Sequence, residues 1–290
     1  MITNLPTVEE YKDVSAKWFF QAKELICEHQ HQVELIKFDK LKIILNQTQL
    51  STSVILLFQS IESFLKAEIC KITPLLLVDL KPNDWPTLPN SKNKEFNELY
   101  TINGESLKRM FCAFNNDESE NKAFIEIYDE IRVKRNQMAH GIYADKLSLE
   151  DLLELLLRAA PIIFKTDLFQ SSLNYDKVYF EDISDFYTQR YYRLNFFEQI
   201  LGVKKVKKYL GVNGRAFWCY KCRNHISVYE TKTAYLFPNK PNGDTVKCLV
   251  CQGLDKVKRK DCIEESCKGN VLLPIKRNQN ICLTCNDDNN

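Results

Sequence analysis

Cysteine pairs toward the carboxyl end constrain this chain more than any other feature of its sequence. Eight of the 11 cysteines follow residue 218 and form four pairs, three of them with the spacing CxxC. A CxxC turn presents two thiolates from one tight loop, so two pairs supply the four ligands of a tetrahedral zinc site. The eight residues are Cys219, Cys222, Cys248, Cys251, Cys262, Cys267, Cys282 and Cys285. We therefore predict two closed structural zinc ions per chain, without an open position for catalysis.

The spacing leaves open how the four pairs share two ions. A sequential arrangement, which we favour, places the first two pairs around one ion and the last two around the other, as in two zinc ribbons. An interleaved arrangement, with the first and third pairs on one ion, fits the same spacing. His225 could replace a ligand, although eight cysteines suffice. A disulfide framework is the rival, and the location expected for the chain argues against it.

No segment has the composition of a membrane span or of a secretory signal. The most apolar stretch, 152–164, is short for a bilayer and contains Glu154, Arg158 and Pro161. The opening residues, MITNLPTVEEYKDV, lack the basic and apolar regions of a signal peptide. The sequence therefore predicts a cytoplasmic protein without membrane contact, in a compartment where clustered cysteines usually bind metal.

The net charge of +2 conceals an asymmetry along the chain. Residues 1–200 carry 23 Lys and Arg against 30 Asp and Glu, a balance of −7, whereas residues 201–290 carry 17 against 8, a balance of +9. Basic residues flank the cysteines, namely Lys204, Lys205, Lys207, Lys208, Arg215, Lys221, Arg223, Lys256, Lys258, Arg259 and Lys260. This favours contact with a polyanion such as RNA, although two zinc ions on eight thiolates remove about four positive charges. A solvated basic surface and a docking site for a protein regulator remain open.

Helical periodicity predicts a bundle over residues 1–170. Thr7 and Glu10 have the spacing of a capping box at the start of a helix. Apolar side chains at helical spacing predict a long, buried helix over 51–72 and another over 123–140. The fold class of this part is therefore mainly α.

Two further segments follow the bundle. Ser148 and Asp151 resemble a second capping box, before a leucine-rich helix that we expect Pro161 to kink. Aromatic residues crowd a helical connector over 171–210, and their density favours packing over stacking on bases. Over 211–290, cysteines, glycines and short β-prone runs replace the helical pattern, which predicts a small β-rich zinc-binding domain.

Arg135 breaks the pattern of the helix that contains it. The apolar stripe of this helix consists of Phe124, Ile127, Ile131 and Met138. Arg135 projects onto the edge of that stripe at about 100° per residue. Burying an unpaired guanidinium is costly, so the side chain must meet a carboxylate, an anionic ligand or a water-filled interface. Positions where local rules fail are often functional.

His140 follows Arg135 at the expected end of the same helix. Asn136 lies one turn before His140 and can hydrogen-bond its imidazole. Asp129 lies on the same side, where its carboxylate either raises the pKa of the histidine or pairs with Arg132. Without a catalytic role, Arg135 would form a structural ion pair and His140 would interact with the helix dipole.

The run from Arg135 to Gly141, RNQMAHG, resembles the motif of the HEPN family, in which an Arg and a His are separated by four to six residues at the end of a helix. The preceding bundle, including the stretch ESFLKAEI around Glu62, is also similar to that family, and the resemblance covers roughly residues 40–170. It implies a helical bundle that forms a homodimer, brings two Arg and two His together, and cleaves RNA without metal.

The resemblance implies a metal-independent endoribonuclease, as found among toxins and anti-phage defence effectors. In this role His140 exchanges a proton with the ribose 2′-hydroxyl or the leaving 5′-oxygen, while Arg135 stabilises the charge at phosphorus. The expected products are a 2′,3′-cyclic phosphate and a 5′-hydroxyl. Asn136 and Asp129 would orient the histidine. The alternative is a non-catalytic dimeric adaptor that binds nucleic acid or protein through its zinc module.

Overall fold

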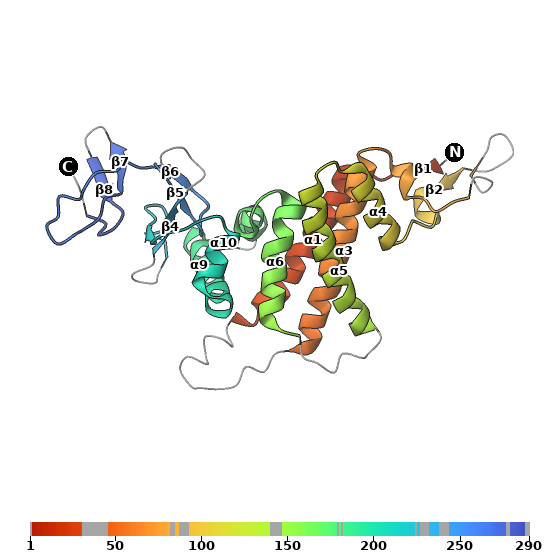
Figure 1. Cartoon of the computed structure of the whole chain (residues 1–290), viewed down its shortest axis with the longest axis horizontal. Helices are drawn as coiled ribbons and strands as arrows, with labels where there is room; N and C mark the ends of the chain where they lie inside the picture. Colours follow the sequence, from red (N-terminus) through yellow and green to blue (C-terminus); the bar gives the residue numbers. More distant parts are fainter. Residues whose placement is uncertain are drawn as a thin grey trace. The chain divides into compact units, whose positions relative to one another are not determined.

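The computed structural model describes residues 2–30, 46–81, 85–86, 93–139, 147–178, 180, 182–223, 225–226, 232–237, 244–276 and 279–287 (Figure 1). The fold is mainly helical, with a β-rich carboxyl-terminal region that carries two clusters of cysteines. This confirms the predicted fold class at that level. The chain divides into two compact units, one of residues 1–28 and 44–152 and the other of residues 29–43 and 153–290. The proposed domain limits at 170 and 210 stay a prediction.

The first unit is built on two long helices, α1 (Val8–Cys27) and α3 (Gln47–Cys70), which pack against each other (Figure 1). The predicted capping box starts α1, because the Thr7 side chain accepts from the backbone N–H of Glu10 at 3.2 Å and the Glu10 carboxylate accepts from that of Thr7 at 2.7 Å. α3 begins before residue 51 because the side chain of Asn46 caps it.

Two more helices of this unit pack on α3, namely α4 (Gly104–Phe114) and α5 (Glu118–Ala139). α5 begins before residue 123 because the Asp117 carboxylate accepts hydrogen bonds from the backbone of Ser119 and Glu120, each at 3.0 Å. The polar residues ahead of the apolar stripe therefore belong to the first turn of the helix.

An aromatic cluster holds these helices together. The ring centres of Phe111 on α4 and Phe124 on α5 lie 4.7 Å apart, and Phe64 on α3 lies 5.9 Å from Phe111. All three side chains are buried. Rings at these distances add to the stability gained by burial, so the cluster fixes the positions of α4 and α5 on α3.

Short elements complete the first unit. Strands β1 (Ile2–Thr3) and β2 (Lys94–Glu95) form a parallel pair. Two 3₁₀ turns, η1 (Pro74–Leu77) and η3 (Phe96–Glu98), lie in the connection between α3 and α4. Hydrogen bonds from Asp79 to Tyr100 and from Ile102 to Leu77 join the two sides of this connection.

α6 (Leu149–Phe164) takes the chain from one unit to the other, since the division falls between Leu152 and Leu153. The Ser148 hydroxyl accepts from the backbone N–H of Asp151 at 3.3 Å, as the sequence predicts. The helix continues through Pro161 to Phe164. Most of its leucines are fully buried, which explains why the segment is so apolar.

The helices of the second unit are α7 (Leu168–Ser171), α8 (Leu173–Val178), α9 (Ile183–Leu201) and α10 (Val203–Tyr209). Gly202 separates α9 from α10 with a φ of +82°, a conformation that glycine adopts without strain. Phe186, Phe196 and Phe197 on α9 are buried, so these aromatic side chains serve packing.

Arg190 on α9 is fully buried and connects several elements of the second unit. Its guanidinium donates to the carbonyl oxygen of Val250 at 2.7 Å and also to the Asp176 carboxylate and the carbonyl of Phe169. Asp176 accepts a further bond from Arg193 at 2.8 Å. A buried guanidinium is stable only when its N–H groups are hydrogen-bonded and its charge is paired. The bond to Val250 also attaches the loop between Cys248 and Cys251 to α9.

Two antiparallel sheets form the carboxyl-terminal part of the second unit. The first has the order β3 (Phe217–Trp218), β4 (Lys232–Leu236), β5 (Thr245–Cys248) and β6 (Leu254–Lys256). The second pairs β7 (Leu272–Lys276) with β8 (Gln279–Cys282). A hydrogen bond of 2.9 Å from Trp218 N–H to the Leu283 carbonyl joins the two sheets.

Replacing Asp176 by Asn tests the buried ion pair. Asp176→Asn should lower the free energy of unfolding by about 3–5 kcal/mol, because Arg190 keeps its charge and loses its counter-ion. Lys71→Gln is the control, since it removes an exposed ion pair with Glu68 and should cost at most about 1 kcal/mol. Urea unfolding of the full chain measures both. Equal effects of the two substitutions would contradict this account.

Candidate functional site

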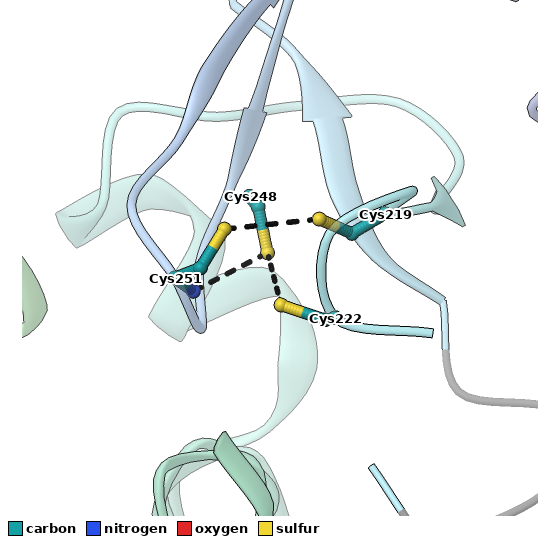
Figure 2. Close-up of side chains that lie close together, drawn as sticks. All are labelled: Cys219, Cys222, Cys248 and Cys251. Atoms are coloured by element: carbon teal, nitrogen blue, oxygen red, sulfur yellow. Dashed lines mark hydrogen bonds between the residues drawn. The ribbon is translucent and has the colours of Figure 1, made fainter. Parts of the chain in front are cut away.

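The first cysteine cluster joins two loops of the four-stranded sheet. Cys219 and Cys222 follow β3, while Cys248 ends β5 and Cys251 lies in the turn after it. Figure 2 shows the four side chains converging. The Sγ atoms of Cys219 and Cys251 lie 3.7 Å apart, and those of Cys222 and Cys248 lie 3.7 Å apart.

The second cluster lies beside the β7–β8 hairpin. The Sγ atoms of Cys262 and Cys285 are 3.6 Å apart, and those of Cys267 and Cys282 are 3.8 Å apart. In each cluster all four sulfur atoms lie within 4.8 Å of one another. The pairs therefore group sequentially, as we favoured, and the interleaved arrangement is not the one found.

The sulfur positions fit metal ligation. A tetrahedral ion with metal–sulfur bonds of about 2.3 Å places its ligands about 3.8 Å apart, close to the separations of both clusters. A disulfide requires sulfur atoms about 2.05 Å apart, and all eight cysteines are free. Two groups of four thiolates can thus hold one metal ion each.

Backbone amides support the ligands. The Cys248 sulfur accepts from the N–H groups of Val250 and Cys251 at 3.4 and 3.5 Å. Gln252, which follows Cys251, has a φ of +58°, and Asn286 has a φ of +71° in the same position after Cys285. Both turns therefore close in the same way after their second cysteine. The N–H groups of Val250 and Cys251 stabilise negative charge on the Cys248 sulfur.

His225 does not join a cluster. Its ring packs against that of Tyr187 at 5.4 Å, and its carbonyl oxygen accepts from the hydroxyls of Ser184 and Thr188. These contacts attach the loop after Cys222 to α9. The histidine therefore helps to seat the first cluster on the helical part of the second unit.

Arg135 lies where α5 faces α3 within the first unit. Its guanidinium carbon lies 4.7 Å from the ring centre of Phe58 on α3, and its Nη1 donates to the Asn136 side-chain oxygen at 2.9 Å. The side chain is partly exposed. The stacked ring and the amide oxygen hold the guanidinium in place.

Glu62 is the acidic side chain whose charge acts on Arg135, although the two form no ion pair among the described residues. It lies one turn after Phe58 on the same face of α3. Burial raises the pKa of its carboxyl above the ordinary value, and the positive charges of Lys66 and Arg135 only partly oppose this. The Glu62 carboxylate is therefore held beside Arg135 at an electrostatic cost.

Gly104, the first residue of α4, lies close to Glu62 and to Tyr128. A Cβ atom on Gly104 would lie 2.5 Å from both a Glu62 oxygen and the Tyr128 hydroxyl, so a larger residue there would force these side chains to move. The Tyr128 hydroxyl is buried and has no hydrogen-bond partner within the part of the chain that the structure describes. Burial and the nearby Glu62 charge raise the pKa of Tyr128 to about 12.

The other predicted site residues divide into two groups. Asp129 pairs with Lys108 at 2.9 Å and with Arg132 at 3.6 Å, the second being the ion pair that we weighed against a histidine partner. His140 lies outside the described residues, as does the glycine that follows it. The structure thus brings Arg135 and Asn136 together and leaves their relation to the histidine a prediction.

Sequence reasoning missed the roles of Glu62 and Tyr128. Glu62 follows Phe58 at an interval of four residues and borders a buried apolar stripe, just as Arg135 does on α5. The sequence therefore shows Glu62 and Arg135, which have opposite charges, each at the edge of an apolar stripe. Only the packing of α3 on α5 brings the two side chains near each other.

Comparisons of the chain with family models, curated proteins and solved structures gave no match. Among the described residues, no helix combines the length and the apolar character that a membrane crossing requires.

Gly269 offers a test of the second cluster. A Cβ there would lie 2.9 Å from the Cys282 sulfur and 2.5 Å from the Thr284 hydroxyl, so Gly269→Ala should distort this cluster alone. Elemental analysis should then give about one metal ion per chain instead of two. Lys268→Ala is the control, since this exposed side chain precedes Gly269 in the same segment. Retention of both ions by Gly269→Ala would contradict the assignment.

Glu62→Gln tests the electrostatic cost of the Arg135 site. Because burial raises the pKa of Glu62, its protonated form contributes stability below about pH 4.5, and this contribution is lost as the pH rises through the folded-state pKa. In the wild type the free energy of unfolding should therefore decrease as the pH rises above 4.5. In Glu62→Gln this decrease should be smaller. Thermal melting across pH 4–7 would show this, with the exposed Glu126→Gln as control. A profile identical to wild type would contradict the argument.

Proposed function

We propose that this chain is a metal-independent endoribonuclease that acts as a toxin or anti-phage defence effector. The observation that carries the proposal is the placement of Arg135, stacked on Phe58 and bonded to Asn136 with a half-buried Glu62 beside it. A guanidinium fixed in this way can bind a phosphate with its remaining N–H groups.

The proposed reaction is the transfer of a phosphodiester to the neighbouring ribose 2′-hydroxyl. His140 removes the proton of the 2′-hydroxyl or protonates the departing 5′-oxygen. Arg135 stabilises the negative charge on the five-coordinate phosphorus. The products are a 2′,3′-cyclic phosphate and a 5′-hydroxyl, and DNA is not cut because it lacks the attacking hydroxyl.

The helical bundle is proposed to act as a homodimer. An arginine at the edge of an apolar stripe is partly exposed in a single chain, and a second copy would place two such sites together. In this proposal His140 acts on the same phosphate as Arg135, and Asn136 orients Arg135 as well as the histidine.

The two cysteine clusters are proposed to hold zinc. Four thiolates are the donor set that zinc takes in closed structural sites, and such sites stabilise a fold without entering the reaction. The basic end of the chain then contacts RNA, and a protein regulator or trigger is the other candidate partner for this module. The proposed location is the cytoplasm.

The decisive experiment compares substitutions of the two proposed catalytic residues. His140→Ala should lower the cleavage rate by roughly 100-fold or more, because a proton transfer is lost. Arg135→Lys should also impair cleavage severely, since an ammonium group cannot hold two phosphoryl oxygens in one plane. Asn136→Ala should have a milder effect. The exposed Lys122→Gln on α5 is the control.

Cleavage of one RNA substrate is followed by sequencing of the RNA ends, with light scattering and melting temperature measured for every variant. Cleavage at the wild-type rate by His140→Ala would overturn the proposed active site. Binding without cleavage by the wild-type protein would favour the adaptor. Immediate loss of cleavage on brief chelation, with the fold intact, would overturn the metal-free mechanism.

A further inference from the structure

The basic side chains around the cysteine clusters fall into two groups. The first group has partners within the second unit. Lys205 pairs with Glu154, Lys207 donates to the Gly214 carbonyl, Arg215 contacts Thr284, Lys221 pairs with Asp255, Arg223 contacts Asn286, Lys232 lies over Trp218, and Lys247 pairs with Asp167. These side chains take part in contacts within the fold, and three of them face a carboxylate.

The second group has no such partner among the described residues. Lys204, Lys208 and Lys268 are exposed members of it, and its other four members lie in one short segment. Lys256, Lys258, Arg259 and Lys260 lie within five consecutive residues, and all four are exposed. None of them forms an ion pair with any residue that the structure describes, although Asp255 next to them does so with Lys221. We call residues 256–260 the basic segment.

The backbone holds the basic segment in an extended form. Lys258 exchanges two hydrogen bonds with Leu272, of 2.8 and 3.0 Å, so the segment bridges β6 and β7. Val257 is buried, whereas Lys256 and Lys258 on either side of it are exposed. This alternation places both lysines on one face, about 6.7 Å apart along the chain.

The basic segment also joins the two cysteine clusters. It lies between Cys251, which is the last cysteine of the first cluster, and Cys262, which is the first of the second. A metal ion in each cluster therefore fixes both ends of the segment. Four cations on a fixed, extended backbone at an exposed site form an array rather than a flexible tail.

We propose that the basic segment binds the phosphate backbone of RNA independently of base sequence. The charges lack acidic partners, and three of the four are lysines, which contact phosphates as point charges without a fixed geometry. An acidic protein surface would be matched better by arginine forks. The inference deepens the proposed function, since it names the surface that holds the RNA, but binding can be measured without cleavage.

The test uses the full chain and a fluorescein-labelled 2′-O-methyl oligoribonucleotide. This probe carries the phosphates and cannot be cut through a free 2′-hydroxyl. Anisotropy titrations over a range of salt concentrations should give a smaller salt slope for K256Q/K258Q/K260Q, by about 2, because each lost phosphate contact removes about 0.7 on a single strand. At about 0.1 M salt this corresponds to binding weaker by on the order of 100-fold.

The matched control is K12Q/K122Q/K177Q, which removes the same charge from exposed lysines on other elements. Equal weakening by both triple variants would show an effect of net charge only and overturn the proposal. Wild-type affinity and slope in K256Q/K258Q/K260Q would overturn it too and favour a protein partner. R259Q/K260Q, which leaves the β6–β7 bridge residue in place, should lower the slope by about 1.4 even if the triple variant loses metal.

Cleavage is measured separately on an ordinary RNA of the same sequence. Weakened probe binding by K256Q/K258Q/K260Q together with no cleavage by the wild-type protein would support the binding surface and reject the ribonuclease. Normal cleavage with unchanged probe binding in the variant would support the ribonuclease and reject the surface. The two proposals therefore fail independently.

Discussion

The carboxyl-terminal third of this protein depends on neutralising clustered thiolates. Its strands contain only two to five residues, which is too little to bury a core of their own. Four thiolates within 4.8 Å repel one another unless a cation lies among them. A metal ion in each cluster would therefore add stability to the apolar burial around Val250 and Leu272. Arg190 links the first cluster to the helices, because its hydrogen bond to Val250 attaches the loop between Cys248 and Cys251 to α9.

A different balance governs the helical unit. Glu62 and Arg135 are placed together where α3 and α5 pack, although burial opposes the ionised carboxylate. Gly104 permits this arrangement, because a larger residue would displace the ends of the Glu62 and Tyr128 side chains. Such a site lowers the free energy of unfolding, and destabilising polar sites are usually found where function requires them. This is the physical argument that connects the packing of the bundle to the proposed chemistry.

The two units have complementary charge roles. Arg135 in the helical unit is one fixed guanidinium group, which suits the binding of one phosphate at a reacting centre. The basic segment offers several exposed cations that suit many phosphates in any sequence. Under the two proposals, the basic segment would hold RNA and the Arg135 site would cleave it. The metal clusters take part only by fixing the ends of the basic segment.

The sequence by itself determined the features that depend on neighbours along the chain. Capping residues such as Thr7, the apolar stripes of the helices and the CxxC turns are local, so they predicted the helical bundle and two groups of four cysteines. The sequential grouping could be favoured but not decided, because the contacts within the clusters join cysteines 15 to 32 positions apart. Only the tertiary structure brought Glu62 within electrostatic reach of Arg135 and separated the partnered cations from those of the basic segment. Both outcomes depend on which surfaces pack together, and side-chain contacts between distant segments leave no periodic signal in the sequence.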